Sequence, residues 1–127
     1  MKFTLATITL GLATLPELTL AGGGFASSCK DWYWMDNKFL VATCKKKNGS
    51  WLKTRQDMNL CIINRDGFMS PEDNGRAFDT CSYVRLEETY LTAYCDMDVG
   101  NEMIDLNQFV ENRDGYMWCF NHRSAPY

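Results

Sequence analysis

The chain has 127 residues, 46% of them hydrophobic and 23% charged, which fits one small folded domain and excludes a disordered or collagen-like protein. Its net charge of −3 gives no overall attraction to nucleic acid or to an anionic membrane. Because His122 is the single histidine, metal sites built on two histidines are excluded, and a Ser-His-Asp centre has one candidate.

The first 26 residues have the order of a secretory signal peptide. Lys2 precedes an uncharged, mostly apolar stretch over 3–15, and small residues follow. This stretch is shorter than the ~20 residues that span a bilayer. A buried N-terminal helix is the alternative interpretation. We expect cleavage after Ala21 or Ala26 and a mature domain over 27–127 that is secreted, extracellular and not inserted in a membrane.

The remainder contains an internal repeat. Segments 57–69 and 105–117 are identical at seven of 13 positions, where chance supplies about one. Upstream, segments 29–44 and 81–95 each begin and end with cysteine and share a Leu and an Ala before the second one. The predicted division is repeat one, a polar hinge and repeat two, over 29–69, 70–76 and 77–127.

Each half is predicted to consist mainly of strands. Segments 38–44 and 89–95 are rich in β-forming residues and lie between polar turns. Asn48-Gly49 predicts a two-residue hairpin turn between strands over 41–47 and 50–55.

The repeated block adds a helical turn and a hairpin to each half. Asp57 and Asp105 are expected to cap single helical turns, and Asp-Gly at 66–67 and at 114–115 predicts hairpin turns. Apolar residues behind the caps are expected to face inward: Met58, Leu60, Ile62, Leu106, Phe109 and Val110.

Six cysteines in an exported chain of this length predict a disulfide framework. Six cysteines allow 15 connectivities. One bond within each half and a third that joins the halves is the pairing that we expect: Cys29–Cys44, Cys81–Cys95 and Cys61–Cys119.

The paired Asp-x-Asn-(four residues)-Asn-x-Asp-Gly blocks, each preceded by a two-cysteine loop, resemble cyanovirin-N homologues over about 27–127. The resemblance implies an all-β cyanovirin-N fold: two pseudo-symmetric tandem repeats with strand exchange, stapled by disulfides. It also implies a lectin that binds mannose-rich glycans on glycoproteins without metal or cofactor. The chain is similar to the secreted members from filamentous fungi.

The resemblance implies two sugar sites, each combining the turn of one half with segments of the other. Sugar hydroxyls need paired donors and acceptors, which Asn, Asp, Arg and backbone groups supply. The first site would contain Ser27, Ser28, Lys45, Lys47, Asn48, Glu111, Asn112, Arg113 and Asp114. The second would contain Asn64, Arg65, Asp66, Arg76, Asp79, Thr80, Asp96 and Asp98. The alternative is that the Asn and Asp residues only satisfy turn backbone.

The two predicted sites differ in charge and length. Asp96 and Asp98 stand where the first half has Lys45 and Lys47, and the second hairpin is three residues shorter. We therefore expect the first site to bind sugar better and the second to be weak or lost. Asn48-Gly49-Ser50 is also an N-glycosylation sequon, and a glycan there would cover the first site.

Other functions have weaker support in the sequence. Asp96, Asp98 and Glu102 lack the spacing of an EF-hand, and Glu87-Glu88 has no partner expected across a cleft. No metal site and no enzymatic activity is therefore expected. The main alternative is a secreted disulfide-rich effector or structural protein that kept the fold and lost sugar binding. The oligomeric state is open between a monomer and a domain-swapped dimer, since Pro71 lies in a short hinge.

Overall fold

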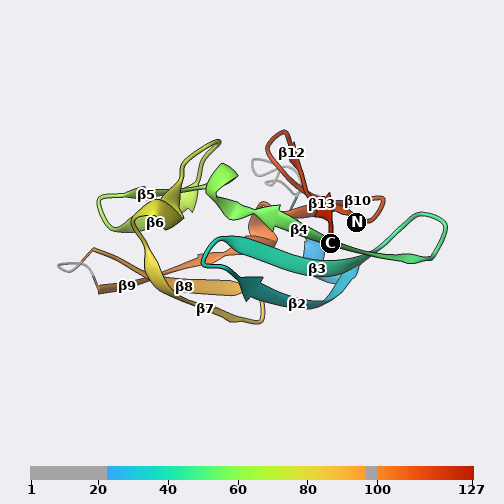
Figure 1. The fold of residues 1–127 in the computed structure, drawn as a ribbon, viewed down its shortest axis with the longest axis horizontal. Helices are drawn as coiled ribbons and strands as arrows, with labels where there is room; N and C mark the ends of the chain where they lie inside the picture. Colours follow the sequence, from blue (N-terminus) through green and yellow to red (C-terminus); the bar gives the residue numbers. More distant parts are fainter. Residues whose placement is uncertain (1–22, 97–99) are drawn as a thin grey trace, which may run out of the picture.

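The chain folds as an all-β protein in the computed structural model, which describes residues 23–96 and 100–127 (Figure 1). The predicted fold class is confirmed, while the signal peptide predicted over 1–26 lies outside the described residues as far as residue 22. In the first half the elements are η2 (Phe25–Ser27), β2 (Cys29–Met35), β3 (Phe39–Lys45), β4 (Trp51–Asp57), η3 (Met58–Leu60), β5 (Ile62–Arg65) and β6 (Phe68–Pro71). In the second half they are η4 (Ala77–Asp79), β7 (Ser82–Glu87), β8 (Tyr90–Asp96), β9 (Gly100–Asp105), η5 (Leu106–Gln108), β10 (Glu111–Arg113), β11 (Tyr116–Cys119), β12 (His122–Arg123) and β13 (Ala125–Pro126).

The predicted repeat is visible in the order of the elements. Each half has a 3-10 turn (η), three antiparallel strands, a second 3-10 turn and a hairpin. The strands expected over 38–44 and 89–95 are β3 and β8, each shifted by one residue. β13 extends the first sheet by pairing with β4, so the sheet order is β13-β4-β3-β2.

The hairpins are exchanged between the halves, as expected. β11 of the second half packs against β3 and β4, while β6 of the first half packs against β9. Figure 1 shows β5 and β6 beside the second sheet and β10 beside the first. A half of this size buries little surface alone, so this exchange supplies the shared core that each half lacks.

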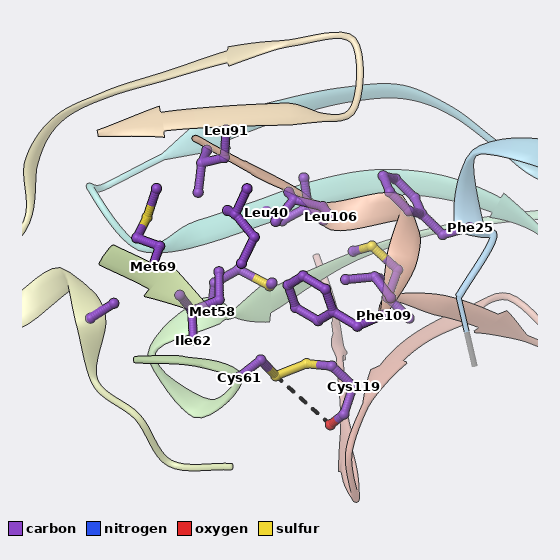
Figure 2. Packing of buried hydrophobic residues seen from close by; sticks show 14 of the residues in the cluster. Phe25, Leu40, Met58, Cys61, Ile62, Met69, Leu91, Leu106, Phe109 and Cys119 are labelled. Carbon is purple, nitrogen blue, oxygen red and sulfur yellow. Dashed lines mark hydrogen bonds between the residues drawn. A yellow bond between two sulfur atoms is a disulfide. The ribbon is translucent and has the colours of Figure 1, made fainter. Parts of the chain in front are cut away.

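Residues of both halves form one buried cluster (Figure 2). Met58 and Leu106, at equivalent positions behind the two caps, are fully buried. Ile62, Phe109 and Val110 are buried as predicted, whereas Leu60 is only half-buried. Full burial of a large apolar side chain contributes about 1.5–3 kcal/mol, so the paired apolar positions hold the halves together.

The three expected disulfides are present. Cys29 and Cys44 face each other across β2 and β3, and Cys81 joins Cys95 in the same way. Cys61 and Cys119, whose Cα atoms lie 6.0 Å apart, connect the halves at the edge of the core (Figure 2).

Both predicted aspartate caps are confirmed. Oδ1 of Asp57 accepts a hydrogen bond from the backbone N–H of Asn59, and Oδ1 of Asp105 accepts one from Asn107, each at 3.0 Å. A carboxylate at this position satisfies a backbone donor that the first turn of a helix leaves free. The caps therefore set the direction in which the chain leaves β4 and β9.

The two-residue turn predicted at Asn48-Gly49 is wrong in detail. β3 ends at Lys45 and β4 begins at Trp51, which leaves a five-residue loop between them. The side-chain Oδ1 of Asn48 accepts the backbone N–H of Ser50 at 2.9 Å, and the N–H of Lys47 donates to Asp114. The backbone N–H of Lys46 still donates to the carbonyl oxygen of Ser50 across the loop at 2.8 Å, so the turn itself consists of the three residues 47–49.

Candidate functional site

Both Asn-Arg-Asp-Gly blocks form the predicted hairpin turns. Asp66 and Asp114 have φ of 55° and 51°, and the glycines that follow have φ of 96° and 94°. Asp and Gly tolerate this left-handed conformation better than most residues, and two such residues in succession match the twist of a hairpin. The turns place each Asp side chain at the exposed tip.

Asn112 anchors the second hairpin to the first half. Its Nδ2 donates to Oγ of Ser28 and to the carbonyl oxygen of Lys45, both at 2.9 Å. Its Oδ1 accepts the backbone N–H of Gly115 at 2.7 Å. The first predicted site is thereby assembled from residues far apart in the sequence.

Asp114 reaches the β3–β4 loop. Its Oδ1 accepts the backbone N–H of Lys47 at 2.8 Å, and the side chains of Lys47 and Asn48 are exposed beside it. This contact leaves the second carboxylate oxygen of Asp114 on an exposed side chain, where a sugar hydroxyl can donate to it.

Glu111 and Arg113 form an ion pair at the base of the same hairpin. Nε of Arg113 lies 2.6 Å from Oε2 of Glu111, and this hydrogen bond raises the pKa of the Arg113 guanidinium above its ordinary value. The guanidinium also lies 4.7 Å from the centroid of the Trp118 ring. Both partners fix the direction of an otherwise mobile side chain.

Ser27 and Lys45 lie at the edge of the first site. The Oγ of Ser27 donates to the carbonyl oxygen of Gly24 at 2.9 Å. The backbone of Lys45 bonds to Ser28 and Asn112, while its side-chain Nζ lies 5.4 Å from the centroid of the Trp51 ring. Lys45 thus contributes backbone to the site and its ammonium to the neighbouring sheet face.

The second predicted site is anchored in the same way. Nδ2 of Asn64 donates to Oγ1 of Thr80 at 2.9 Å and to the carbonyl oxygen of Cys95 at 3.2 Å. Its Oδ1 accepts the backbone N–H of Gly67 at 2.8 Å. The structure therefore brings the Asp66 turn beside Thr80 and the end of β8.

Ion pairs surround this second site. Nη2 of Arg65 lies 2.6 Å from Oε1 of Glu72, and Nε of Arg76 lies 2.7 Å from Oδ2 of Asp79. Asp96 is half-buried at the end of β8, and Asp98 lies outside the described residues. Both sites therefore contain ion-paired arginines, and the first site also carries the exposed side chain of Lys47. The charge difference predicted from Asp96 and Asp98 stays a prediction, because Asp98 lies outside the described residues.

No role was predicted from the sequence for the Asn of each Asp-x-Asn motif, Asn59 and Asn107. Oδ1 of Asn59 accepts the backbone N–H of Phe78 at 2.7 Å, and Oδ1 of Asn107 accepts that of Ala26 at 2.9 Å. Each Asn thus fixes the 3-10 turn that precedes the first cysteine of a half. The repeat of the motif was the signal, but its partners lie in the opposite half.

Gly115 also has a role that its turn type does not indicate. A Cβ at this position would lie 2.7 Å from Cγ of Lys46 and 3.1 Å from Cβ of Leu52. The hairpin can therefore lie this close to the β3–β4 loop only with glycine at its tip.

Within residues 23–96 and 100–127, no cluster of three or more His, Cys, Asp or Glu side chains could hold a metal ion. No helix there is both long and apolar enough to cross a membrane.

Among known protein families, the CVNH domain matches residues 25–118 of this chain. No curated protein matches the chain.

Solved structures of the same fold include three that are informative. The CVNH of T. borchii is 26% identical, with a TM-score of 0.63 over 76% of this chain and 99% of that one. The microvirin–mannobiose complex is 26% identical, with a TM-score of 0.65 over 77% of this chain and 99% of that one. A MoCVNH3 variant in complex with (N-GlcNAc)4 is 18% identical, with a TM-score of 0.72 over 80% of this chain and 99% of that one.

Proposed function

Since the chain belongs to the CVNH-domain family, we propose that it is a secreted, non-catalytic lectin that binds mannose-containing glycans without a metal ion. The signal-peptide pattern over 1–26 supports secretion. The turn residues at the two hairpin tips supply the polar groups that sugar hydroxyls need.

One observation supports sugar binding most strongly: the crossed anchoring of the hairpins. Asn112 bonds to Ser28 and Lys45, and Asp114 bonds to the backbone of Lys47. These bonds hold exposed polar side chains from two distant segments in one fixed arrangement. A rigid set of donors and acceptors binds a polyol at a lower entropy cost than mobile side chains do.

The choice of mannose is supported by one solved structure of the same fold. Microvirin, at 26% identity, has been solved with mannobiose. The MoCVNH3 variant solved with a GlcNAc oligomer is only 18% identical, so its likeness bears on the fold. GlcNAc oligomers are accordingly the comparison ligands for a specificity test.

We further propose that the first site is the stronger one. It offers the ammonium of Lys47 and the amide of Asn48 beside Asp114, all exposed. The arginines do not distinguish the sites, because Arg113 is paired with Glu111 at the first site as Arg65 is with Glu72 at the second. The ranking therefore rests on the exposed side chains of Lys47 and Asn48.

The test is a calorimetric titration of a mannose disaccharide and of GlcNAc oligomers into the oxidised domain and into two variants. Asp114→Ala should lower the affinity for the mannose ligand about tenfold, because a carboxylate that accepts from a hydroxyl contributes about 1.5–3 kcal/mol. Asp66→Ala, the matched change at the second turn, should have less than half of that effect.

Three outcomes would contradict the proposal. Equal losses of affinity from Asp114→Ala and Asp66→Ala would show that the first site does not bind more strongly than the second. Tighter binding of GlcNAc oligomers than of the mannose disaccharide would show that mannose is not the preferred ligand. A glycan array without signal would favour the effector that kept the fold and lost the sugar sites.

A further inference from the structure

The solvent face of the first sheet carries cations and aromatic rings close together. The strand register places Lys30, Thr43 and Lys53 in one row and Tyr33, Val41 and Arg55 in the next. Side chains directly opposite one another on paired strands share a face of the sheet. We call the following residues the basic-aromatic face: Lys30, Lys45, Trp51, Lys53, Arg55 and Tyr127.

Aromatic rings hold the cations of this face in place. Nζ of Lys30 lies 4.0 Å from the centroid of the Trp51 ring, and Nζ of Lys53 lies 5.3 Å from that of Tyr127. The guanidinium carbon of Arg55 lies 5.3 Å from the Tyr127 centroid. Contacts of this kind are attractive even at exposed sites, so the charges form an ordered array before any ligand arrives.

The net charge of −3 hides a strong separation of charge between the halves. Residues 23–69 include eight Lys or Arg and four Asp or Glu, whereas residues 70–127 include four and eleven. The first half therefore carries +4 and the second −7. A patch of one sign concentrates oppositely charged ligands whatever the net charge of the molecule.

The second sheet shows that the fold does not require these cations. Its matching rows are Ser82, Tyr94 and Asn101, and then Arg85, Thr92 and Met103. Asn101 and Met103 thus occupy the register positions that Lys53 and Arg55 occupy in the first sheet, on the same backbone. The basic-aromatic face is a property of this sequence and not of the architecture.

We propose that the basic-aromatic face binds a linear acidic polysaccharide, one that carries carboxylate or sulfate groups along its length. Charge complementarity selects a polyanion, and four cations spread over three strands match a chain with repeated anionic groups. Stacked nucleobases are a poorer match, because bases need open ring faces and cations already lie over Trp51 and Tyr127. This surface shares only Lys45 with the sites proposed to bind neutral mannose, and the variants below leave Lys45 unchanged, so the two proposals can fail separately.

Affinity electrophoresis of the oxidised domain in gels containing polygalacturonate, dextran sulfate or uncharged dextran would test this proposal. We expect retardation by at least one of the two polyanions, none by dextran, and a weaker effect at higher salt. The double variant K53N/R55M introduces the residues of the second sheet. It should weaken polyanion binding about tenfold, since two exposed ion pairs with the ligand are lost.

A matched control removes the same charge elsewhere. The double variant R85N/R123M also lowers the net charge by two, through exposed residues of β7 and β12. It should bind the polyanions within twofold of the unmodified domain, and circular dichroism should show both variants folded. Equal losses from both double variants, no retardation by either polyanion, or stronger retardation by single-stranded oligothymidine would overturn the proposal.

Discussion

Asn112 uses its whole amide group inside the protein, and Asn64 does the same at the equivalent position. Sequence reasoning left open whether these side chains bind sugar or satisfy turn backbone. Each forms its turn and also fixes the hairpin to the opposite half, through partners such as Ser28, 84 residues away. The residue type and the turn could be predicted from the sequence, but these partners could not, since they depend on the exchange of hairpins.

The role of Asn112 predicts a loss of stability when it is replaced. Asn112→Ala removes three hydrogen bonds, one of them from the part-buried backbone N–H of Gly115, so unfolding should become easier by about 2 kcal/mol. Urea denaturation of the oxidised domain measures this change. Asn101→Ala, on an exposed strand position, serves as control and should stay within about 0.5 kcal/mol of the original. A similar small effect at Asn112 would show that the hairpin does not depend on this anchor.

Two roles are open to the side chain of Asn48: hydrogen bonding within the β3–β4 loop and attachment of a glycan. Its Oδ1 accepts from both the backbone and the Oγ of Ser50, in an exposed loop beside Lys47. If the sequon is glycosylated on export, the mass of the secreted protein should fall on enzymatic glycan removal, and Ser50→Ala should abolish that difference. An unchanged mass would discard the modification. With a glycan attached, Asn48→Gln should increase binding at the first site.

At the scale of single elements, the aspartate caps and the two Asp-Gly turns could be predicted because they are local. The β3–β4 loop could not, since its conformation depends on Asp114, 67 residues away from Lys47. The strand positions were predicted to within a residue for β3 and β8. Local signals therefore located the elements, and contacts between the halves decided their edges.

The caps predict a graded loss of stability. Asp57→Ala should lower the free energy of unfolding by about 1 kcal/mol, because one backbone N–H loses its acceptor. Asp105→Ala should cost more, since Oδ1 of Asp105 also accepts the hydroxyl of Thr89 at 2.8 Å. Chemical denaturation of both variants compares them.

Asp57→Asn is the matched variant, because an amide oxygen still accepts from the backbone of Asn59. It should retain most of the stability that Asp57→Ala loses. Equal losses from the Asn and Ala variants would show that the negative charge matters, through Lys38 at 3.9 Å, and that capping does not.

For the whole molecule, the segment before the first cysteine belongs to the folded domain. Phe25 is fully buried, packs against Trp32 with 5.1 Å between ring centroids, and donates its backbone N–H to Val110. The sequence offered two cleavage positions for the signal peptide, after Ala21 or Ala26. Cleavage after Ala21 retains Phe25, whereas cleavage after Ala26 removes it from the core.

We therefore predict that the mature protein begins at Gly22. Mass spectrometry of the secreted protein identifies its first residue directly. Domains produced over 22–127 and 27–127 should differ in stability by about 3–5 kcal/mol, the usual cost of losing a buried Phe. A mature protein that starts at Ser27 with undiminished stability would contradict the contribution assigned to Phe25.

The bond between Cys61 and Cys119 turns residues 61–119 into a covalent ring that encloses the segment 70–76, which the sequence predicts to be a hinge. If two copies traded their second halves by opening that hinge, Cys119 of each would meet Cys61 of the other. The two copies of this domain-swapped dimer would be joined by disulfides. They would migrate at twice the monomer mass in non-reducing, denaturing gel electrophoresis. The oligomeric state would then be fixed when the disulfides form. Monomer and dimer could interconvert only after a reductant breaks these bonds.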